Sequence, residues 1–307
     1  MYPIQNSFSH FNFNIRIMKS SLLMIIPILL GILVLPATAQ NNEYILDENY
    51  DLTADGTVFL DSEDAEVTIT GSNRNDVHLS VYHRVDVDGI EWGGGDFKMN
   101  ITQRNGDIYI EEAGGNSNSF RIGNIEREYR ITIHIPRSVP IDIKGDDGTY
   151  DLSDTGGAIR IAADDSDINI RNAAGEDFTF MIDDGAIYMD KGQGKLSITL
   201  DDGEFRVENG LFSEIDASAD DGDLSFGTEL YDDGRYNFSI DDGELELDIL
   251  DGGGNIDVVY DDTNINIFGG FTIISDSEER TVYSVSGGSA SIGIRIEDGE
   301  LYLRNSK

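Results

Sequence analysis

From about residue 141 onward, apolar and polar residues alternate in short runs that recur along the chain. In the unit Leu196–Val207, the apolar residues before Asp201-Asp202-Gly203 have even numbers and those after it have odd numbers. A period of two residues predicts strands with one buried face. The change of parity predicts that Asp-Asp-Gly turns the chain so that both strands face one core, with glycine supplying a positive φ.

Acidic pairs of this kind begin at residues 146, 164, 183, 201, 220, 241, 261 and 297, so most units are 18–21 residues long. A second bend, such as Gly192-Gln193-Gly194 or Glu208-Asn209-Gly210, closes each unit. Units of equal length with matching residues stack like on like. The repeat therefore predicts an all-β fold, a parallel β-solenoid (β-helix) whose consecutive coils lie above one another. An antiparallel sandwich or prism built from hairpins is the alternative.

Residues 40–140 alternate in the same way, for example in Glu66–Thr70 and Val77–Val81, but lack the acidic unit. We expect an irregular β start of the same solenoid, acting as an N-terminal cap over edges that would otherwise be unpaired. A separate β domain is the alternative. The predicted divisions are a signal peptide over 1–39, an N-terminal β region over 40–140 and the Asp-Asp-Gly repeat solenoid over 141–307.

The signal peptide is predicted from Met18-Lys19, an apolar run over Leu22–Leu35 and the small residues Ala37 and Ala39 before the cleavage point. Translation is expected to begin at Met18. The apolar run is shorter than the roughly 20 residues that span a bilayer, although an uncleaved anchor is the alternative. We therefore expect an exported protein, located in the periplasm, on the cell surface or outside the cell, with no transmembrane segment after cleavage. The absence of cysteine excludes disulfides and a lipoprotein.

Charge narrows the choice of partners. The chain has 59 acidic and 21 basic residues, a formal net charge of −38. Nucleic acid is excluded as a partner, because phosphate binding requires clustered positive charge. Cations, basic surfaces and a salty environment remain compatible with this charge. The sequence does not identify the surface or envelope ligand or the oligomeric state.

The acidic corners are the strongest candidate for chemistry. Stacked coils would bring carboxylates of successive corners to about 4.8 Å, where like charges repel. Calcium could relieve this repulsion by bridging neighbouring carboxylates. The candidate ligands are Asp183, Asp184, Asp201, Asp202, Asp220, Asp221, Asp241 and Asp242. Ordinary solvated turns are the alternative, since the nonapeptide of calcium β-rolls is absent.

Catalytic patterns are absent from the sequence. His78, His83 and His134 lie in strand-like segments without a metal-type spacing. The carboxylates recur with a period, whereas an active site is a single exception, so we predict a protein that is not an enzyme. A carbohydrate-binding face would favour a row of outward aromatic residues. The outward strand positions are Asp151, Asn169, Tyr188, Arg206, Ser225, Glu246, Asn266 and Tyr302, of which two are aromatic. Trp92 lies in a glycine-rich segment, where we expect its ring to pack over the end of the solenoid; presentation to a partner is the alternative.

The chain resembles the bacterial putative-adhesin family, a domain of unknown function in exported and envelope proteins. Three features carry the resemblance: the strand and glycine turn of Ala65–Gly71, the strand Ile131–Pro136 leading to Val139–Gly145, and the repeated units in which an acidic pair and glycine precede a strand. The resemblance implies parallel β coils, an envelope location and adhesion. It supplies no catalytic residues.

Overall fold

The structure is a computed structural model that describes residues 43–92, 96–113 and 120–307. The predicted signal peptide lies outside these residues. Every helix or strand in the described part is a β-strand, so the prediction of an all-β protein is confirmed. Asn41–Lys307 forms one compact unit. None of the described residues belongs to a helix long and apolar enough to cross a bilayer.

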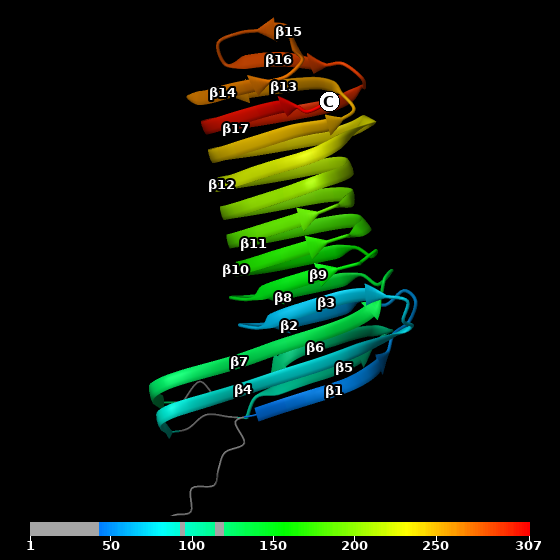
Figure 1. The fold of residues 1–307 in the computed structure, drawn as a ribbon, viewed down its shortest axis with the longest axis vertical. Coiled ribbons are helices and arrows are strands. Elements are labelled where there is room, and N and C mark those ends of the chain that lie inside the picture. Colours follow the sequence, from blue (N-terminus) through cyan, green and yellow to red (C-terminus); the bar gives the residue numbers. More distant parts are fainter. Residues whose placement is uncertain (1–42, 93–95, 114–119) are drawn as a thin grey trace, which may run out of the picture. The chain divides into compact units, whose positions relative to one another are not determined.

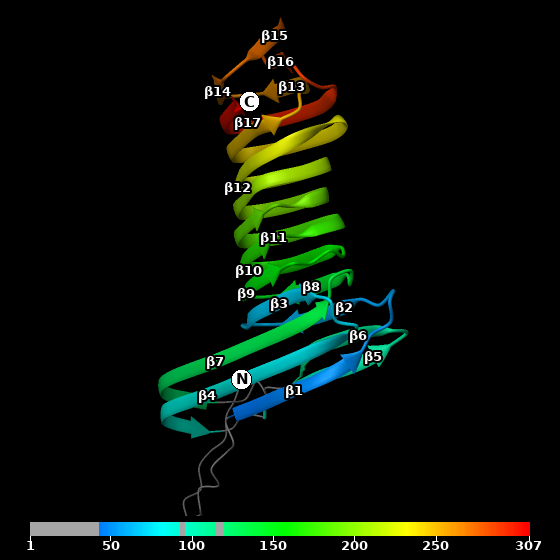
Figure 2. The same ribbon diagram turned by 45° about the vertical axis from the view of Figure 1, so that its right-hand side comes forward.

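The strands form one 17-stranded sheet that is mostly parallel and winds into two walls (Figures 1 and 2). In stacking order, the first wall contains β5 (Lys98–Arg104), β6 (Asp107–Ala113), β2 (Val58–Ser62), β8 (Ile141–Gly145), β10 (Ile159–Arg171), β11 (Ala174–Asp190), β12 (Gln193–Asp251), β17 (Ala290–Asn305), β13 (Gly254–Tyr260), β16 (Arg280–Val285) and β15 (Phe271–Asp276). The second contains β1 (Glu43–Asp51), β4 (Asp76–Trp92), β7 (Phe120–Pro136), β3 (Glu66–Ser72), β9 (Thr149–Ser153), then β10, β11, β12 and β17, and finally β14 (Thr263–Phe268).

The repeat units pair in parallel with like residues in register. Ile168 of β10 lies beside Ile187 of β11, and Ile187 lies beside Phe205 of β12. The antiparallel alternative for these units is therefore wrong. Alternation explains the pairing, because a shift of one residue would turn every apolar side chain from the core to solvent.

The core consists of the apolar residues that the alternation predicts. Within one coil, Leu196, Ile198, Leu200, Phe205 and Val207 are all 2% exposed or less. Each such side chain contributes roughly 1.5–3 kcal/mol through burial. Since every coil repeats this set, stability is distributed along the stack, with each coil supported by its neighbours.

Close packing between coils explains the corner glycines. Gly185, Gly203, Gly243 and Gly299 have φ between 123° and 153°. A Cβ on Gly243 would lie 2.3 Å from the carbonyl oxygen of Gly222 in the neighbouring coil. The predicted positive φ is thus confirmed at four corners. It is wrong for Gly148 and Gly222, which adopt ordinary φ values.

The second bend has its own repeated conformation. Asp154, Asn172, Lys191 and Asn209 have φ between 53° and 61°, a left-handed region that Asn and Asp tolerate better than most residues. The backbone N–H of Asn172 donates to Asp190 at 3.1 Å, which ties this bend to the next coil. The left-handed conformation therefore lies at Gly194 and Asn209 within the predicted bends 192–194 and 208–210, and at Lys191 just before the first of them.

The stacking order departs from the sequence order at the C-terminal end. Asp242 and Gly243 of β12 lie beside Asp298 and Gly299 of β17, and Thr263 of β14 lies on the other side of Gly299. The last strand of the chain is thus inserted between β12 and the earlier strands β13 and β14. The expectation that consecutive units lie directly above one another is wrong here.

A similar insertion joins the N-terminal region to the repeats. Val58 of β2 lies beside Ile141 of β8 on one side and Ile108 of β6 on the other, always in parallel. Beyond these strands, β1, β4, β5 and β7 add antiparallel pairs. The domain boundary at residue 140 stays a prediction, although β2 and β8, which lie on opposite sides of it in the sequence, pair directly. At the far end of the β4–β7 pair, Trp92 lies beside Phe120.

Candidate functional site

The structure brings the predicted acidic residues together along one edge of the stack. Asp165 lies beside Asp184, and Asp242 lies beside Asp298. Among the described residues, no three His, Cys, Asp or Glu side chains are arranged so that they could hold a metal ion. Calcium binding by the eight predicted aspartates, Asp183, Asp184, Asp201, Asp202, Asp220, Asp221, Asp241 and Asp242, stays a prediction.

Crowding at the corners changes the acidity of individual carboxyls. Desolvation, followed by the charges of Asp221, Asp298 and Asp241, raises the pKa of Asp242 above its usual 3.8. Desolvation and the charge of Asp147 act in the same direction on the pKa of Asp146. At these two corners, neighbouring carboxylates therefore oppose one another in the folded chain.

Neutralising one corner should stabilise the fold. The pKa of Asp242 is higher in the folded than in the unfolded chain. The protonated carboxyl therefore favours the folded chain, and this contribution is lost as the pH rises through the pKa of the folded state. We expect Asp242→Asn to raise the melting temperature by about 2 °C at pH 7. The variant and the parent should converge below pH 3.8, the usual pKa of this group. Thermal melts across pH check this. Asp216→Asn, which removes a charge from a strand face, is the control, and an equal gain there would contradict a corner effect.

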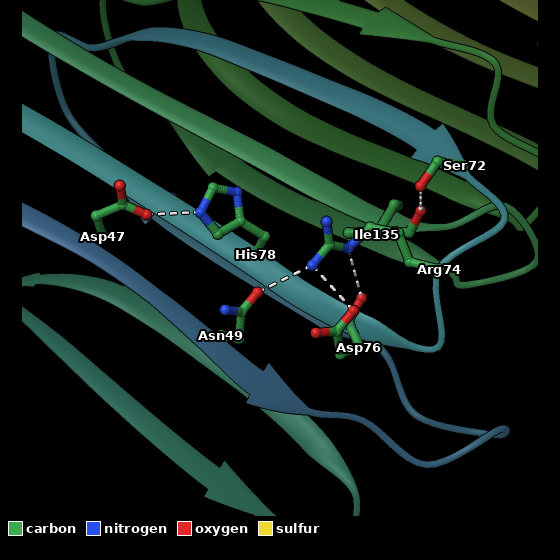
Figure 3. Close-up of polar contacts among 7 residues, drawn as sticks. All are labelled: Asp47, Asn49, Ser72, Arg74, Asp76, His78 and Ile135. Carbon is green, nitrogen blue, oxygen red and sulfur yellow. Dashed lines mark hydrogen bonds and ion pairs between the residues drawn. The ribbon is translucent and has the colours of Figure 1, made fainter.

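A polar cluster on β1 and β4 illustrates what the sequence did not predict (Figure 3). His78 and His134 lie opposite each other on β4 and β7, with ring centroids 5.8 Å apart. The Nε2 atom of His78 lies 2.6 Å from Asp47, and Arg74 donates to Asn49 at 2.9 Å. These contacts tie β1 to β4 at the end of the sheet.

The two aromatic residues among the predicted outward positions do not form a row. Tyr188 lies between Asn169 and Arg206, whereas Tyr302 lies between Glu246 and Asn266. The two tyrosines therefore belong to different parts of the second wall. The hydroxyl of each donates to a glutamate, Glu208 and Glu300 respectively.

The longest interval between neighbouring coils of β12 identifies another candidate site. The acidic pairs at residues 220 and 241 are 21 residues apart, compared with 18 or 19 for the preceding units. Phe226 and Tyr236 are buried strand residues that lie before and after the second bend. Ten residues separate them in number, whereas eight separate Val207 and Ile215 in the preceding coil. The extra residues therefore lie in the second bend, between Phe226 and Tyr236.

A surface groove of about 320 Å³ lies along these second bends. Its lining comes from five successive bends: Gly156, Ala174, Gly175, Glu176, Gln193, Gly194, Ser213 and Tyr231. The floor consists of small residues because the coils approach closely there. A Cβ on Gly175 would lie 2.4 Å from the carbonyl oxygen of Gly157. Glu176 is the one ionisable carboxylate among these lining residues.

Hydrogen bonds through a buried tyrosine fix the backbone of Tyr231, which lies in the lengthened bend. Its backbone N–H donates to the hydroxyl of Tyr236 at 2.9 Å, and that hydroxyl donates to the carbonyl of Phe212 at 2.8 Å. Tyr236 is 1% exposed, whereas Tyr231 is 36% exposed. The buried tyrosine therefore fixes the backbone that presents the exposed one to the groove.

These features define an all-β repeat protein on a mostly parallel sheet. A model of the Toastrack DUF4097 family matches residues 57–304, so the chain belongs to this family. The match confirms the resemblance to a putative-adhesin domain of unknown function. No curated protein matches the sequence.

Several solved structures are similar to this chain. A putative adhesin from Parabacteroides distasonis is 10% identical, with 85% of this chain and 97% of that one covered and a TM-score of 0.47. A putative adhesin from Parabacteroides merdae is 11% identical, with 84% and 95% covered and a TM-score of 0.40. A putative lipid binding protein from Parabacteroides distasonis is 12% identical, with 86% and 97% covered and a TM-score of 0.26.

Proposed function

We propose that this chain is an exported, non-enzymatic protein of the cell envelope or cell surface that binds a surface ligand, as an adhesin-type module. The observation that carries the proposal is the groove over five stacked bends. An open groove on a rigid wall can hold an extended ligand along the stack. The predicted signal peptide supports export.

Two further features support binding rather than catalysis. The interior positions of each coil are filled by apolar side chains, as Phe205 and Phe226 illustrate with 0% exposure. The acidic side chains recur from coil to coil, as at Asp165 and Asp184, which fits a structural role.

The proposal includes a particular form of the scaffold. It is a β-solenoid with coils of about 18–21 residues, in which the antiparallel strands β1, β4 and β5 act as a cap at the N-terminal end. Strands β15 and β16 would protect the opposite end, because antiparallel pairing leaves fewer unpaired edges of the parallel stack.

A binding assay on intact surfaces tests this function. The chain without residues 1–39 is labelled with a fluorophore and incubated with bacterial envelope fractions and with host-cell surface material. We expect saturable retention on at least one of these surfaces that excess unlabelled chain abolishes. A heat-unfolded sample is the control. Failure to bind any surface in the panel would favour the alternative, a structural solenoid of the envelope without a specific ligand.

A further inference from the structure

We infer that the groove beside Tyr231 binds an uncharged polysaccharide whose chain runs along the stack. This inference rests on the proposed function, because it names the ligand class of that surface. The first argument is the shape of the site. The groove crosses five bends, those of Gly156, Ala174, Gln193, Ser213 and Tyr231, so an extended polymer fits it better than a compact ligand.

The second argument is the chemistry of the rim. The Gln193 amide both donates and accepts hydrogen bonds, as does the Ser213 hydroxyl, and the Glu176 carboxylate accepts them. Sugar hydroxyls need this mixture of donors and acceptors. The Tyr231 ring adds an apolar surface with a polar tip at the end of the groove. Few placed polar groups beside an aromatic surface are typical of small-molecule sites.

Charge determines which polysaccharide fits. The chain has a formal net charge of −38, and the groove contains a carboxylate but no Lys or Arg among its lining residues. An acidic polysaccharide would be repelled by this surface. Lys195, which follows Gly194 in the chain, and Arg235 both lie within ion-pair distance of Glu214, and Arg137 lies within ion-pair distance of Asp154. A neutral polymer avoids this repulsion.

The third argument is that the site is an exception to the repeat. The bend of Tyr231 is two residues longer than the bend of the preceding coil. The hydroxyl of Tyr236 then fixes its backbone. Core packing alone does not require an exposed tyrosine at this position. The repeated coils stabilise the stack, whereas the one irregular coil places a different set of side chains at a single position along it.

Affinity electrophoresis of the chain without residues 1–39 tests the inference. Native gels contain neutral polysaccharides (laminarin, xyloglucan or galactomannan) or acidic ones (alginate or polygalacturonate). We expect retardation in at least one neutral gel and none in the acidic gels. Tyr231→Ala should weaken the apparent affinity at least tenfold, whereas Tyr231→Phe should retain most of it. Gln193→Ala should weaken it about threefold.

The matched control is Tyr302→Ala, which removes an outward tyrosine from the second wall, away from the groove. It should leave retardation unchanged, and thermal melts show whether each variant folds. No retardation in any neutral gel, binding to acidic gels alone, or equal binding by Tyr231→Ala would overturn the inference. If the intact chain still binds surface material in those cases, the proposed function stands and only the ligand class and site fall.

Discussion

Deleting residues 290–307 is expected to unfold the C-terminal end of the stack and to lower the melting temperature by more than about 10 °C. Strand β17 contributes Ile292, Ile294, Ile296, Leu301 and Leu303, each 2% exposed or less. Burial of five such side chains contributes on the order of 10 kcal/mol, before the loss of chain entropy. In addition, β14 pairs with β17 and with no other described strand. Its backbone amides should lose their protection when β17 is absent.

Hydrogen exchange with thermal melts checks this expectation. Amides of Gly254–Tyr260 and Thr263–Phe268 should exchange rapidly in the deletion variant, while those of β10 and β11 remain protected, because each coil depends on its neighbours. Deletion of residues 306–307 alone is the control, since it leaves β17 complete. Retained protection of β13 and β14 would mean that they stack directly on β12 in sequence order. The inserted position of β17 would then not be required for their folding.

Much of the repeat architecture follows from alternation and glycine placement. The even and odd parity around Asp201-Asp202-Gly203 predicted two strands with inward residues, and Leu200 and Phe205 are both buried. This succeeds because a two-residue period is a local property of the backbone. Like residues at equal spacing also predicted parallel pairing, which Ile168, Ile187 and Phe205 show.

The order in which the coils stack could not be predicted from the alternation of apolar and polar residues. Every coil presents nearly the same ladder of hydrogen bonds and apolar residues, so β13 and β17 are both suited to lie on β12. The signal was present in the spacing of 36 between the acidic pairs at 261 and 297. The unit at 297–301 also matches 241–245 more fully than the unit at 261–265 does.

The candidate groove shows a different limit. The 21-residue interval, together with the positions of Phe226 and Tyr236, is enough to locate the extra residues in the second bend. The conformation that exposes Tyr231 there depends on contacts between distant residues, such as the hydrogen bond from Tyr236 to Phe212. The opposed pair of His78 and His134 likewise depends on the register of β4 against β7. Neither can be derived from local propensity.

Replacing Gly243 by alanine is expected to destabilise the chain by about 2–4 kcal/mol and to lower its melting temperature by roughly 5–10 °C. Gly243 has a φ of 141°, which side-chain-bearing residues rarely adopt. The added Cβ would also lie 2.3 Å from the carbonyl oxygen of Gly222. Since backbone surrounds this position, relief requires the two coils to separate and their ladder hydrogen bonds to lengthen. Thermal and denaturant unfolding of the purified variant measure the loss.

Gly222→Ala is a matched control, because Gly222 occupies the same position of the motif in the neighbouring coil. Its φ is ordinary, and a Cβ there would lie 3.1 Å from the carbonyl oxygen of Gly203. We expect this substitution to cost less than about 1 kcal/mol, since alanine also restricts the unfolded chain. Equal losses at the two positions would show that the motif itself, rather than the close approach of two coils at one corner, requires glycine. A larger loss at Gly222 would contradict the contact geometry that places Gly243 against the carbonyl oxygen of Gly222.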